Sequence, residues 1–304
     1  MSIHSPIKYV AQQQVDKKKW DACIERSSNG LIYGYSFYLD SMAKHWDALV
    51  LNDYEAVMPL TWNRKWGIKY LYQPPLTSQL GIFSATTISE KMTGLFLQQV
   101  TSRFRFAEIF FNYNNYHPVF KSCCNYILAL KTPYDALRLA YKKNLLRNLK
   151  KAGQFELSYT SNFDLRKALS HHQQQYGEKT PHVLHQDYAH FEKLCLQLSR
   201  TGEVVTRAVF DKENNLLAVA VLLLKKNRLY LVEPTTFERG RKMQANHFLI
   251  DAIIQEFSEK DMILDMVGSD IPGVALFYKN FGCIDQPYYF YYFNRLPWPL
   301  HLLK

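Results

Sequence analysis

The sequence has 304 residues, is 47% hydrophobic and 15% aromatic, and carries 37 Lys+Arg against 27 Asp+Glu, a formal net charge of +10. This composition excludes intrinsic disorder and collagen-like or low-complexity fibres, and the length predicts two domains. The N-terminal residues lack the apolar segment of a secretion signal. The longest apolar run, Leu216 to Leu224, is shorter than the roughly 20 residues of a membrane-spanning helix. We therefore expect no membrane span. Five cysteines without a CxxC pair predict free thiols in a reducing, cytoplasmic setting.

The first half of the chain has the periodicity of two helices, a three-stranded meander, a further helix and a strand. Thr87 and Glu90 have the spacing of a capping box at the start of that further helix. The predicted elements are a helical region at 16–44 that is broken near Asn29-Gly30, strands at 46–51, 54–62 and 68–73, a helix after residue 90, and a strand at 106–111.

The second half repeats this order and ends with one more helix and strand. Pro272 suits the first turn of the last helix, Ser269 or Asp270 its cap, and Gly282 its end. The predicted elements are a strand at 155–160, helices at 164–177 and 186–199, strands at 203–210, 216–224 and 228–233, a helix at 244–257, and strands at 262–266 and 288–293.

Two pentapeptides match between the halves, at the end of the third meander strand. Residues 70–74 read Tyr-Leu-Tyr-Gln-Pro and residues 230–234 read Tyr-Leu-Val-Glu-Pro, 160 positions apart. A chance match would not explain why the same meander, loop, helix and strand surround both. The sequence therefore predicts two copies of one α/β unit, at 1–133 and 154–304, joined by a helix at 134–153.

The excess positive charge is local. Residues 134–153 carry 6 basic residues and 1 acidic residue, half of the net +10, whereas residues 154–304 are neutral overall. Lys143, Arg147 and Lys150 fall on one face of the predicted joining helix. The alternatives are a solvated helix between domains and a contact for a phosphate-bearing ligand, whose binding would weaken with salt.

A helix that follows the meander and returns to a parallel strand forms a β-α-β crossover, and its free N–H groups can bind a phosphate. In the second half, Arg239, Gly240, Arg241 and Lys242 lie just before that helix. The corresponding loop of the first half, residues 75–87, has no Lys or Arg. The sequence thus favours an anion site in the second crossover only, against the alternative of a solvated turn. No spacing predicts a metal site or a serine or cysteine triad.

The segment Ala275-Leu276-Phe277-Tyr278-Lys279-Asn280-Phe281-Gly282 resembles the end of the GNAT acyltransferase fold, where a helix carries a tyrosine before the next strand. Together with the duplication and the basic joining helix, it makes the chain similar to the FemAB-like family, built from two tandem GNAT units. The resemblance implies an α/β (α+β) fold in which each unit is a mixed, mostly antiparallel sheet flanked by helices. It also implies a cytoplasmic N-acyltransferase.

The resemblance implies the following site. The acyl donor's pantetheine arm would pair with the strand at Leu231 and Val232, and the coenzyme pyrophosphate would lie on Arg239 to Gln244, although the usual pattern has a second small residue here. Glu233 would be the base for the amine and Tyr278 the acid for the leaving group. Gln73, the first-half counterpart of Glu233, joins Lys143, Arg147 and Lys150 as a substrate or phosphate contact.

The donor and acceptor stay open at this stage. Acyl-coenzyme A is the expected donor, with aminoacyl-tRNA as the alternative, and the acceptor is an amine on a small molecule or a cell-wall precursor. No DNA partner and no metal are expected. The competing hypothesis is a non-catalytic binding module that uses the same fold to hold a nucleotide-linked sugar or an RNA end.

Overall fold

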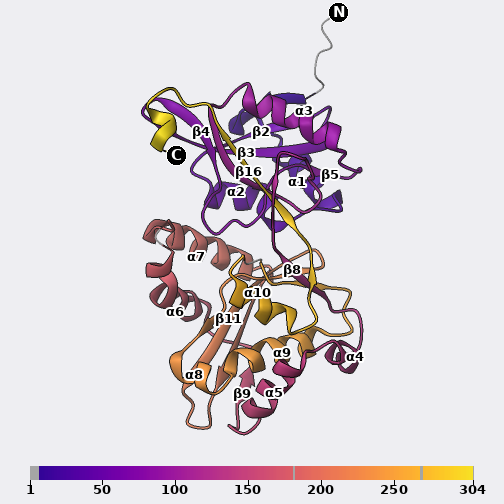
Figure 1. Cartoon of the computed structure of the whole chain (residues 1–304), viewed down its shortest axis with the longest axis vertical. Coiled ribbons are helices and arrows are strands. Elements are labelled where there is room, and N and C mark those ends of the chain that lie inside the picture. The colour runs from indigo at the N-terminus through magenta and orange to yellow at the C-terminus, as the bar shows by residue number, and fades with distance from the viewer. Residues whose placement is uncertain (1–6, 181, 268–269, 304) are drawn as a thin grey trace, which may run out of the picture. The chain divides into compact units, whose positions relative to one another are not determined.

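The computed structural model describes residues 7–180, 182–267 and 270–303 and divides into two compact units. The first contains Met1–Cys123 and Pro287–Lys304, and the second contains Cys124–Gln286. Each unit has its own sheet and its own hydrophobic core. Figure 1 shows the elements of both.

The sheet of the first unit has the strand order β1-β2-β3-β4-β6-β16-β7, with β5 paired to β3. Its strands are β1 (Ile7–Val10), β2 (Trp46–Leu51), β3 (Ala56–Lys65), β4 (Ile68–Tyr72), β5 (Phe83–Ser84), β6 (Phe106–Phe111), β7 (Lys121–Cys123) and β16 (Tyr288–Asn294). Its helices are α1 (Lys17–Arg26), α2 (Ser36–Met42) and α3 (Glu90–Thr101), with short 3₁₀ helices at Gln12–Gln14, Ile32–Gly34 and Leu300–Leu303.

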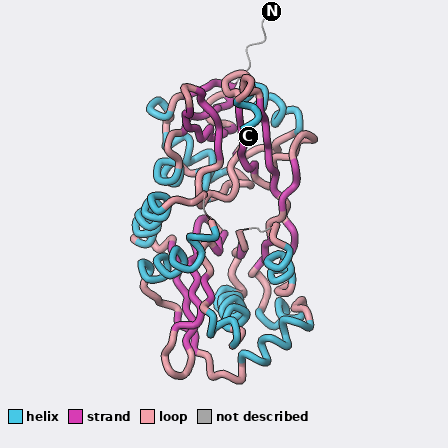
Figure 2. Tube along the Cα trace, turned by 60° about the vertical axis from the view of Figure 1, so that its left-hand side comes forward, coloured by secondary structure: helices cyan, strands magenta, loops and turns pink. Residues whose placement is uncertain are grey.

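The sheet of the second unit has the strand order β15-β8-β14-β12-β11-β10-β9, with β13 paired to β11. Figure 2 shows its strands running between the helices. Its strands are β8 (Tyr126–Ala129), β9 (Ser158–Thr160), β10 (Val204–Phe210), β11 (Leu216–Lys225), β12 (Arg228–Leu231), β13 (Thr235–Thr236), β14 (Ile263–Asp265) and β15 (Ile284–Asp285). Its helices are α4 (Tyr134–Leu139), α5 (Lys143–Ala152), α6 (Leu165–Tyr176), α7 (His185–Ser199), α8 (Glu238–Lys242), α9 (Ala245–Phe257) and α10 (Pro272–Lys279), with a 3₁₀ turn at Gly177–Lys179.

The two units repeat one arrangement, as the matching pentapeptides predict. In each, a three-stranded antiparallel meander is followed by a helix and a strand that runs parallel to the third meander strand. The parallel pairs are β4 with β6 and β12 with β14. All other strand pairs of both sheets within the described residues are antiparallel. The predicted fold class, two mixed and mostly antiparallel sheets flanked by helices, is confirmed.

The units do not follow the predicted ranges of 1–133, 134–153 and 154–304. The aromatic strand β16 pairs with β6 and β7 in the first unit, and β8 pairs with β14 in the second. The basic helix α5 is part of the second unit, where it packs beside α9. Each sheet thus contains a strand from the other half of the sequence. The pattern of apolar residues along the chain predicts a strand but not which sheet it joins.

Four local predictions need correction. Ser89, and not Thr87, caps α3, since its side chain accepts from the Met92 N–H. Ile271 is the N-cap of α10 in place of Asp270, and Ser269 lies outside the described residues. Residues 238–242 form a short helix where a loop was expected, and β12 ends at Leu231 where a strand to 233 was expected.

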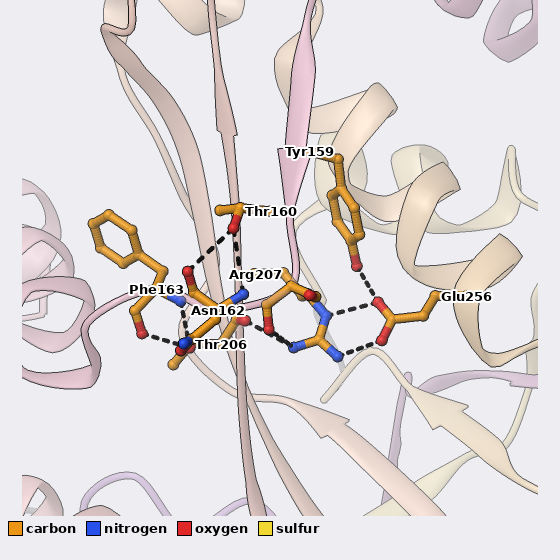
Figure 3. Close-up of polar contacts among 8 residues, drawn as sticks. Tyr159, Thr160, Asn162, Phe163, Thr206, Arg207 and Glu256 are labelled. Atoms are coloured by element: carbon orange, nitrogen blue, oxygen red, sulfur yellow. Dashed lines mark hydrogen bonds and ion pairs between the residues drawn. The ribbon is translucent and has the colours of Figure 1, made fainter.

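A polar network ties the edge of the second sheet to α9. The Arg207 side chain on β10 donates to both carboxylate oxygens of Glu256 on α9, and the Tyr159 hydroxyl on β9 donates to the same carboxylate. The Arg207 Nη1 also donates to the Ser161 carbonyl at 2.6 Å. Figure 3 shows the guanidinium between the carboxylate and the strand backbone. The network fixes α9, whose other residues border the site described next.

No helix of the described residues is both long and apolar enough to cross a bilayer. The five cysteines are free thiols. Within the described ranges, no cluster of His, Cys, Asp or Glu has the arrangement of a metal site.

Candidate active site

A cleft of about 380 Å³ lies in the second unit, at the end of β12 and beside the first turns of α9 and α10. This volume is within the range of small-molecule sites, roughly 300–1,000 Å³. The lining residues come from α6, the β12–β13 strand, α9 and α10: Tyr176, Leu231, Pro234, Thr236, Asn246, Leu249, Ile250, Gly273, Val274, Phe277 and Tyr278.

A β-bulge opens the cleft. Leu231 pairs with Leu222 and Thr235 with Val219, so three residues on one strand face two on its neighbour. The N–H groups of Val232 and Glu233 both point to the carbonyl of Val221. Proline has no N–H to offer a strand partner, so Pro234 suits the interrupted position. The bulge turns the strand away where its parallel pairing with β14 ends, at Tyr230 and Asp265.

The bulge also decides which backbone groups face the cleft. The Val232 N–H is used by β11, so Val232 points away from the open edge. Backbone groups alternate along a strand, and those of Leu231 therefore point to the side that β14 has left. Of the two predicted pantetheine contacts, the geometry favours Leu231.

Tyr278 lines the cleft and is largely buried, with 7% of its surface exposed. No hydrogen bond joins its hydroxyl to another described residue, and its ring lies beside those of Phe277 and Tyr126. Burial raises the pKa of Tyr278 above its ordinary value. The phenol therefore keeps its proton at neutral pH and can donate a hydrogen bond to a ligand.

Glu233 lies behind the cleft wall and is not among the residues that line it. It is 2% exposed, and its Oε2 is 3.0 Å from Nε2 of His172 on α6. Burial raises the pKa of Glu233, an effect that His172 opposes. His172 Nδ1 is 3.2 Å from the Thr235 hydroxyl, and the centroid of its ring is 4.9 Å from that of Tyr176, a cleft residue. His172 thus connects Glu233 to a wall residue and to Thr235, which precedes the lining residue Thr236.

The three cations of α8 have partners within the unit. Arg239 is 2.8 Å from the carboxylates of both Asp211 and Glu213, and Lys242 is 2.7 Å from Glu238. Arg241 donates to the carbonyl of Thr236. Because these side chains are already paired, they are less available to bind a pyrophosphate.

Gly240 packs α8 against the sheet. A Cβ built at this position would lie 2.2 Å from the carbonyl oxygen of Leu217 on β11. The glycine therefore allows a close approach of helix and strand, a role that differs from the predicted contact with the pyrophosphate.

Gln244 ends this connection in the left-handed region, with φ of 60°, and precedes α9 as its N-cap. Its carbonyl accepts from the N–H groups of His247 and Phe248, and its side chain donates to Arg241 and does not cap the helix. The first N–H groups of α9, those of Ala245 and Asn246, have no acceptor within the helix. These groups are next to the cleft, because Asn246 lines it.

The predicted basic face of α5 is exposed. Lys143, Arg147 and Lys150 are all exposed, and Arg147 donates to Asn144 one turn earlier. The helix meets α9 where Asn148 is 3.1 Å from His247. None of these cations lines the cleft.

In the first unit, the chain itself fills the corresponding gap. Leu80 runs beside the end of β6, donating to the carbonyl of Phe110 and accepting from the N–H of Asn112. The Gln73 side chain accepts from the N–H of Phe110 at 3.0 Å and donates to Thr77 at 2.8 Å. Gln73 was predicted to contact substrate or phosphate, and the structure gives its amide two partners from its own unit.

Comparison with known proteins identifies the fold. Residues 138–279 match the family model described as an acetyltransferase (GNAT) domain, and this range includes every residue that lines the cleft. The chain has a tandem GNAT fold of the FemAB-like type. Among solved structures, FemX matches with a TM-score of 0.65 and 12% identity over 97% of this chain and 99% of that one.

Two further solved structures are similar to this chain. The C-terminal domain of a putative lysylphosphatidylglycerol synthetase from Agrobacterium fabrum matches with a TM-score of 0.56 and 11% identity, over 95% of this chain and 94% of that chain. A tandem GNAT protein from the clavulanic acid biosynthesis pathway matches at 0.50 and 9% identity, over 96% and 99%. No curated protein sequence matches the chain.

Sequence reasoning missed several cleft residues of this GNAT unit. Asn246 follows the predicted loop by two residues, and Tyr176 ends a helix far away in the sequence. Asn246 and Tyr176 become neighbours only in the folded chain, where both line the cleft beside the bulge. Nothing in the spacing of the sequence links His172 to Glu233.

Proposed function

We propose that the chain is an N-acyltransferase whose second GNAT unit holds an acyl thioester in the cleft and passes the acyl group to an amine. The observation that carries the proposal is the cleft beside the β12–β13 bulge. Its wall contains Tyr278, whose hydroxyl makes no hydrogen bond to another described residue. The thioester carbonyl would lie near Leu231, whose backbone groups face the open edge, and the pantetheine arm would continue the interrupted strand pairing.

The reaction forms a C–N bond and breaks a C–S bond. The amine loses its proton to water, because no residue of the described lining is a carboxylate or a histidine, and the departing sulfur gains one. We assign Tyr278 as the donor to the sulfur, since the phenol stays protonated at neutral pH. The Glu233 carboxylate and His172 are positioning residues in this scheme, because they brace Thr235 and Tyr176 from behind the wall.

The phosphates of the donor are proposed to lie toward the open first turn of α9. Its unsatisfied N–H groups favour negative charge. Arg239, Arg241 and Lys242 are close in sequence but would have to exchange existing partners. Lys143, Arg147 and Lys150 on the neighbouring helix are exposed and can contribute longer-range attraction to a phosphate-bearing donor or to a cell-wall precursor that bears phosphate.

The test combines binding and turnover. Acetyl-coenzyme A at about 100 times its dissociation constant should stabilise the protein by roughly 2.7 kcal/mol. With an amine panel, thiol release by Tyr278→Phe should fall by about 100-fold or more relative to wild type, while donor binding is retained. Tyr291→Phe, a buried tyrosine of the first unit, is the matched control and should keep wild-type turnover.

Two results would contradict the proposal. If no acyl-coenzyme A changes the melting temperature, this donor class is wrong. If donors bind but no amine in the panel gives thiol release, the fold would serve as a binding module, the competing hypothesis for a nucleotide-linked ligand.

A further inference from the structure

Two tryptophans of the first unit are exposed. Trp66 in the β3–β4 hairpin is 65% exposed and Trp298 near the C-terminus is 77% exposed, whereas Trp20 and Trp46 are fully buried in the same unit. Tryptophan is highly buried on average, because its large apolar side chain gains much from leaving water. The two exposed indoles contribute little to the core, so packing does not explain them.

The segments that carry these two tryptophans meet in one place. A groove of about 180 Å³ lies between them, and Figure 1 shows the yellow C-terminal segment beside β4. Leu302, in the same 3₁₀ helix as the groove residue Leu300, is also exposed. We call Trp66, Trp298, Leu302 and the groove the tryptophan surface. The groove is lined mainly by apolar side chains, among them Trp66, Ile68, Tyr70, Phe106, Leu296 and Leu300.

The tip of the hairpin has a backbone conformation that does not favour tryptophan. Lys65 pairs with Ile68, so Trp66 and Gly67 form a two-residue turn, in which their φ angles are 49° and 77°. Such a turn favours Asn-Gly, and a positive φ is unusual for a bulky residue. Residues in unfavourable conformations cluster at functional positions. The indole of Trp66 is therefore better explained by binding than by folding.

The charge around the tryptophan surface has one sign. The segments 63–70, 103–106 and 294–303 contain six basic residues and no acidic one. Lys69 is paired with Asp47. The Lys65 ammonium lies 4.7 Å from the centre of the Trp66 ring. Four of the cations are exposed and form no ion pair within the described residues, namely Arg64, Lys65, Arg105 and Arg295.

We propose that the tryptophan surface binds the face of an anionic lipid bilayer. Indoles prefer the level of the lipid headgroups, and exposed Lys and Arg are attracted to anionic phosphates. The exposed leucine would enter the boundary of the acyl chains, where apolar area adds to the affinity. The contact is peripheral and spans nothing. It goes beyond the proposed function, because it concerns the first unit and does not depend on the donor that the second unit binds.

Single-stranded RNA is the other polyanion that combines with cations and indoles, through stacking of its bases. Its bases stack on flat rings, and the leucines and prolines of residues 296–302 are aliphatic. In a bilayer the same side chains gain by leaving water. The aliphatic share of the surface thus favours lipid.

The experiment measures co-sedimentation of the whole chain with vesicles of phosphatidylcholine alone, or of phosphatidylcholine with about one third phosphatidylglycerol. Wild type should bind the anionic vesicles at least about tenfold more tightly than the neutral ones, and the affinity should fall as salt is added. Tryptophan emission should move to shorter wavelength on binding, because the indoles leave water.

Trp66→Asn combined with Trp298→Ser is the main variant. Asparagine suits the turn, so the melting temperature should be retained while vesicle affinity falls at least about tenfold. Val119→Ser removes a side chain that is also exposed but belongs to the loop between β6 and β7, and it should bind vesicles as wild type does.

The cations have their own matched pair of variants. Lys65→Gln with Arg295→Gln should lower the affinity for anionic vesicles at least about tenfold. Lys18→Gln with Lys91→Gln removes the same charge from exposed positions at the starts of α1 and α3, and should lower it far less.

Three results would overturn the inference. Failure of wild type to bind anionic vesicles would refute it, whatever the result of the acyl donor assays. An equal loss in the two charge variants would show that net charge alone decides. Binding of single-stranded RNA that requires Trp66 and Trp298, without binding to vesicles, would assign the surface to nucleic acid.

Discussion

Gly240 of α8 lies directly against the backbone of Leu217 on β11. A Cβ on Gly240 would be 2.2 Å from the Leu217 carbonyl oxygen, closer than a non-bonded carbon and oxygen can approach. Because the obstacle is backbone, no side-chain rotation can relieve it. The loop that sequence alone suggests for phosphate binding is thus a packed helix, and its glycine serves the contact between helix and sheet.

Gly240→Ala should therefore destabilise the second unit. The helix must move away from β11, and strain of this kind typically costs about 1–3 kcal/mol. Thermal unfolding should show a lower melting temperature. Gly94→Ala in α3 is the control, since a Cβ there meets nothing closer than 3.6 Å and alanine favours a helix. A Gly240→Ala protein as stable as wild type would refute the packing role.

Gln73→Ala should destabilise the protein without affecting the donor. The substitution removes the acceptor of the Phe110 N–H and leaves that donor group unsatisfied, at a cost of about 1–3 kcal/mol. Gln73→Glu keeps the acceptor oxygen for Phe110 but sets a second oxygen against the Thr77 carbonyl, so it should also lose stability. Denaturant unfolding and donor titration measure the two effects. A weakened donor affinity with unchanged stability would restore the original prediction of a substrate contact.

Glu256→Gln should cost stability at the lower end of the roughly 3–5 kcal/mol expected for a broken buried ion pair, because Glu256 keeps a quarter of its side-chain exposure. Burial acts to raise the pKa of Glu256, but hydrogen bonds from Arg207 and Tyr159 overcome this and lower it. The carboxylate therefore contributes stability above its unfolded pKa, and the contribution is lost as pH falls through the folded value. Unfolding free energies against pH should show this acid-side loss in wild type and a smaller loss in Glu256→Gln.

His247 should make the protein sensitive to mild acid. Burial lowers the pKa of His247 to about 4, so the unfolded chain takes up a proton at higher pH than the folded one. Its contribution to the free energy of unfolding is steady above about pH 6.5 and falls between about pH 6.5 and pH 4.

His247→Gln is the test of this pH dependence, because glutamine can keep the contact with Asn148 but does not titrate. The variant should have a shallower dependence of unfolding free energy on pH in that window. His301→Gln, on an exposed residue of the first unit, should retain the wild-type slope. An unchanged slope in His247→Gln would show that the imidazole is solvated and not buried.

The fold was largely predictable because both halves keep strong local patterns. The strand Phe106–Phe111 is predicted to the residue, and the matching pentapeptides mark the third meander strand in both units. The exchange of β16 could not be predicted, since a run of aromatic residues shows that a strand is buried and not which sheet contains it.

The lining of the cleft was predictable in part. Tyr278 and Leu231, both named from the resemblance to the GNAT fold, are among the residues that line it. The charges of α8 were misleading, because Asp211 and Glu213 approach Arg239 only when the turn between β10 and β11 folds beside it. Glu233 presents a similar difficulty, since only the tertiary structure shows that His172 faces it from α6.

The central claim is that the cleft beside β12 binds the acyl donor, and calorimetry of propionyl-coenzyme A with wild type and Gly273→Trp tests it most directly. Gly273 lines the cleft and a Cβ there meets no atom within 4 Å, so tryptophan adds bulk at the cleft without a clash at its Cβ. Gly153→Trp, at the exposed end of α5, is the control. The account predicts binding by wild type and Gly153→Trp, and a loss of at least about tenfold in affinity for a correctly folded Gly273→Trp. Wild-type affinity in Gly273→Trp would contradict it.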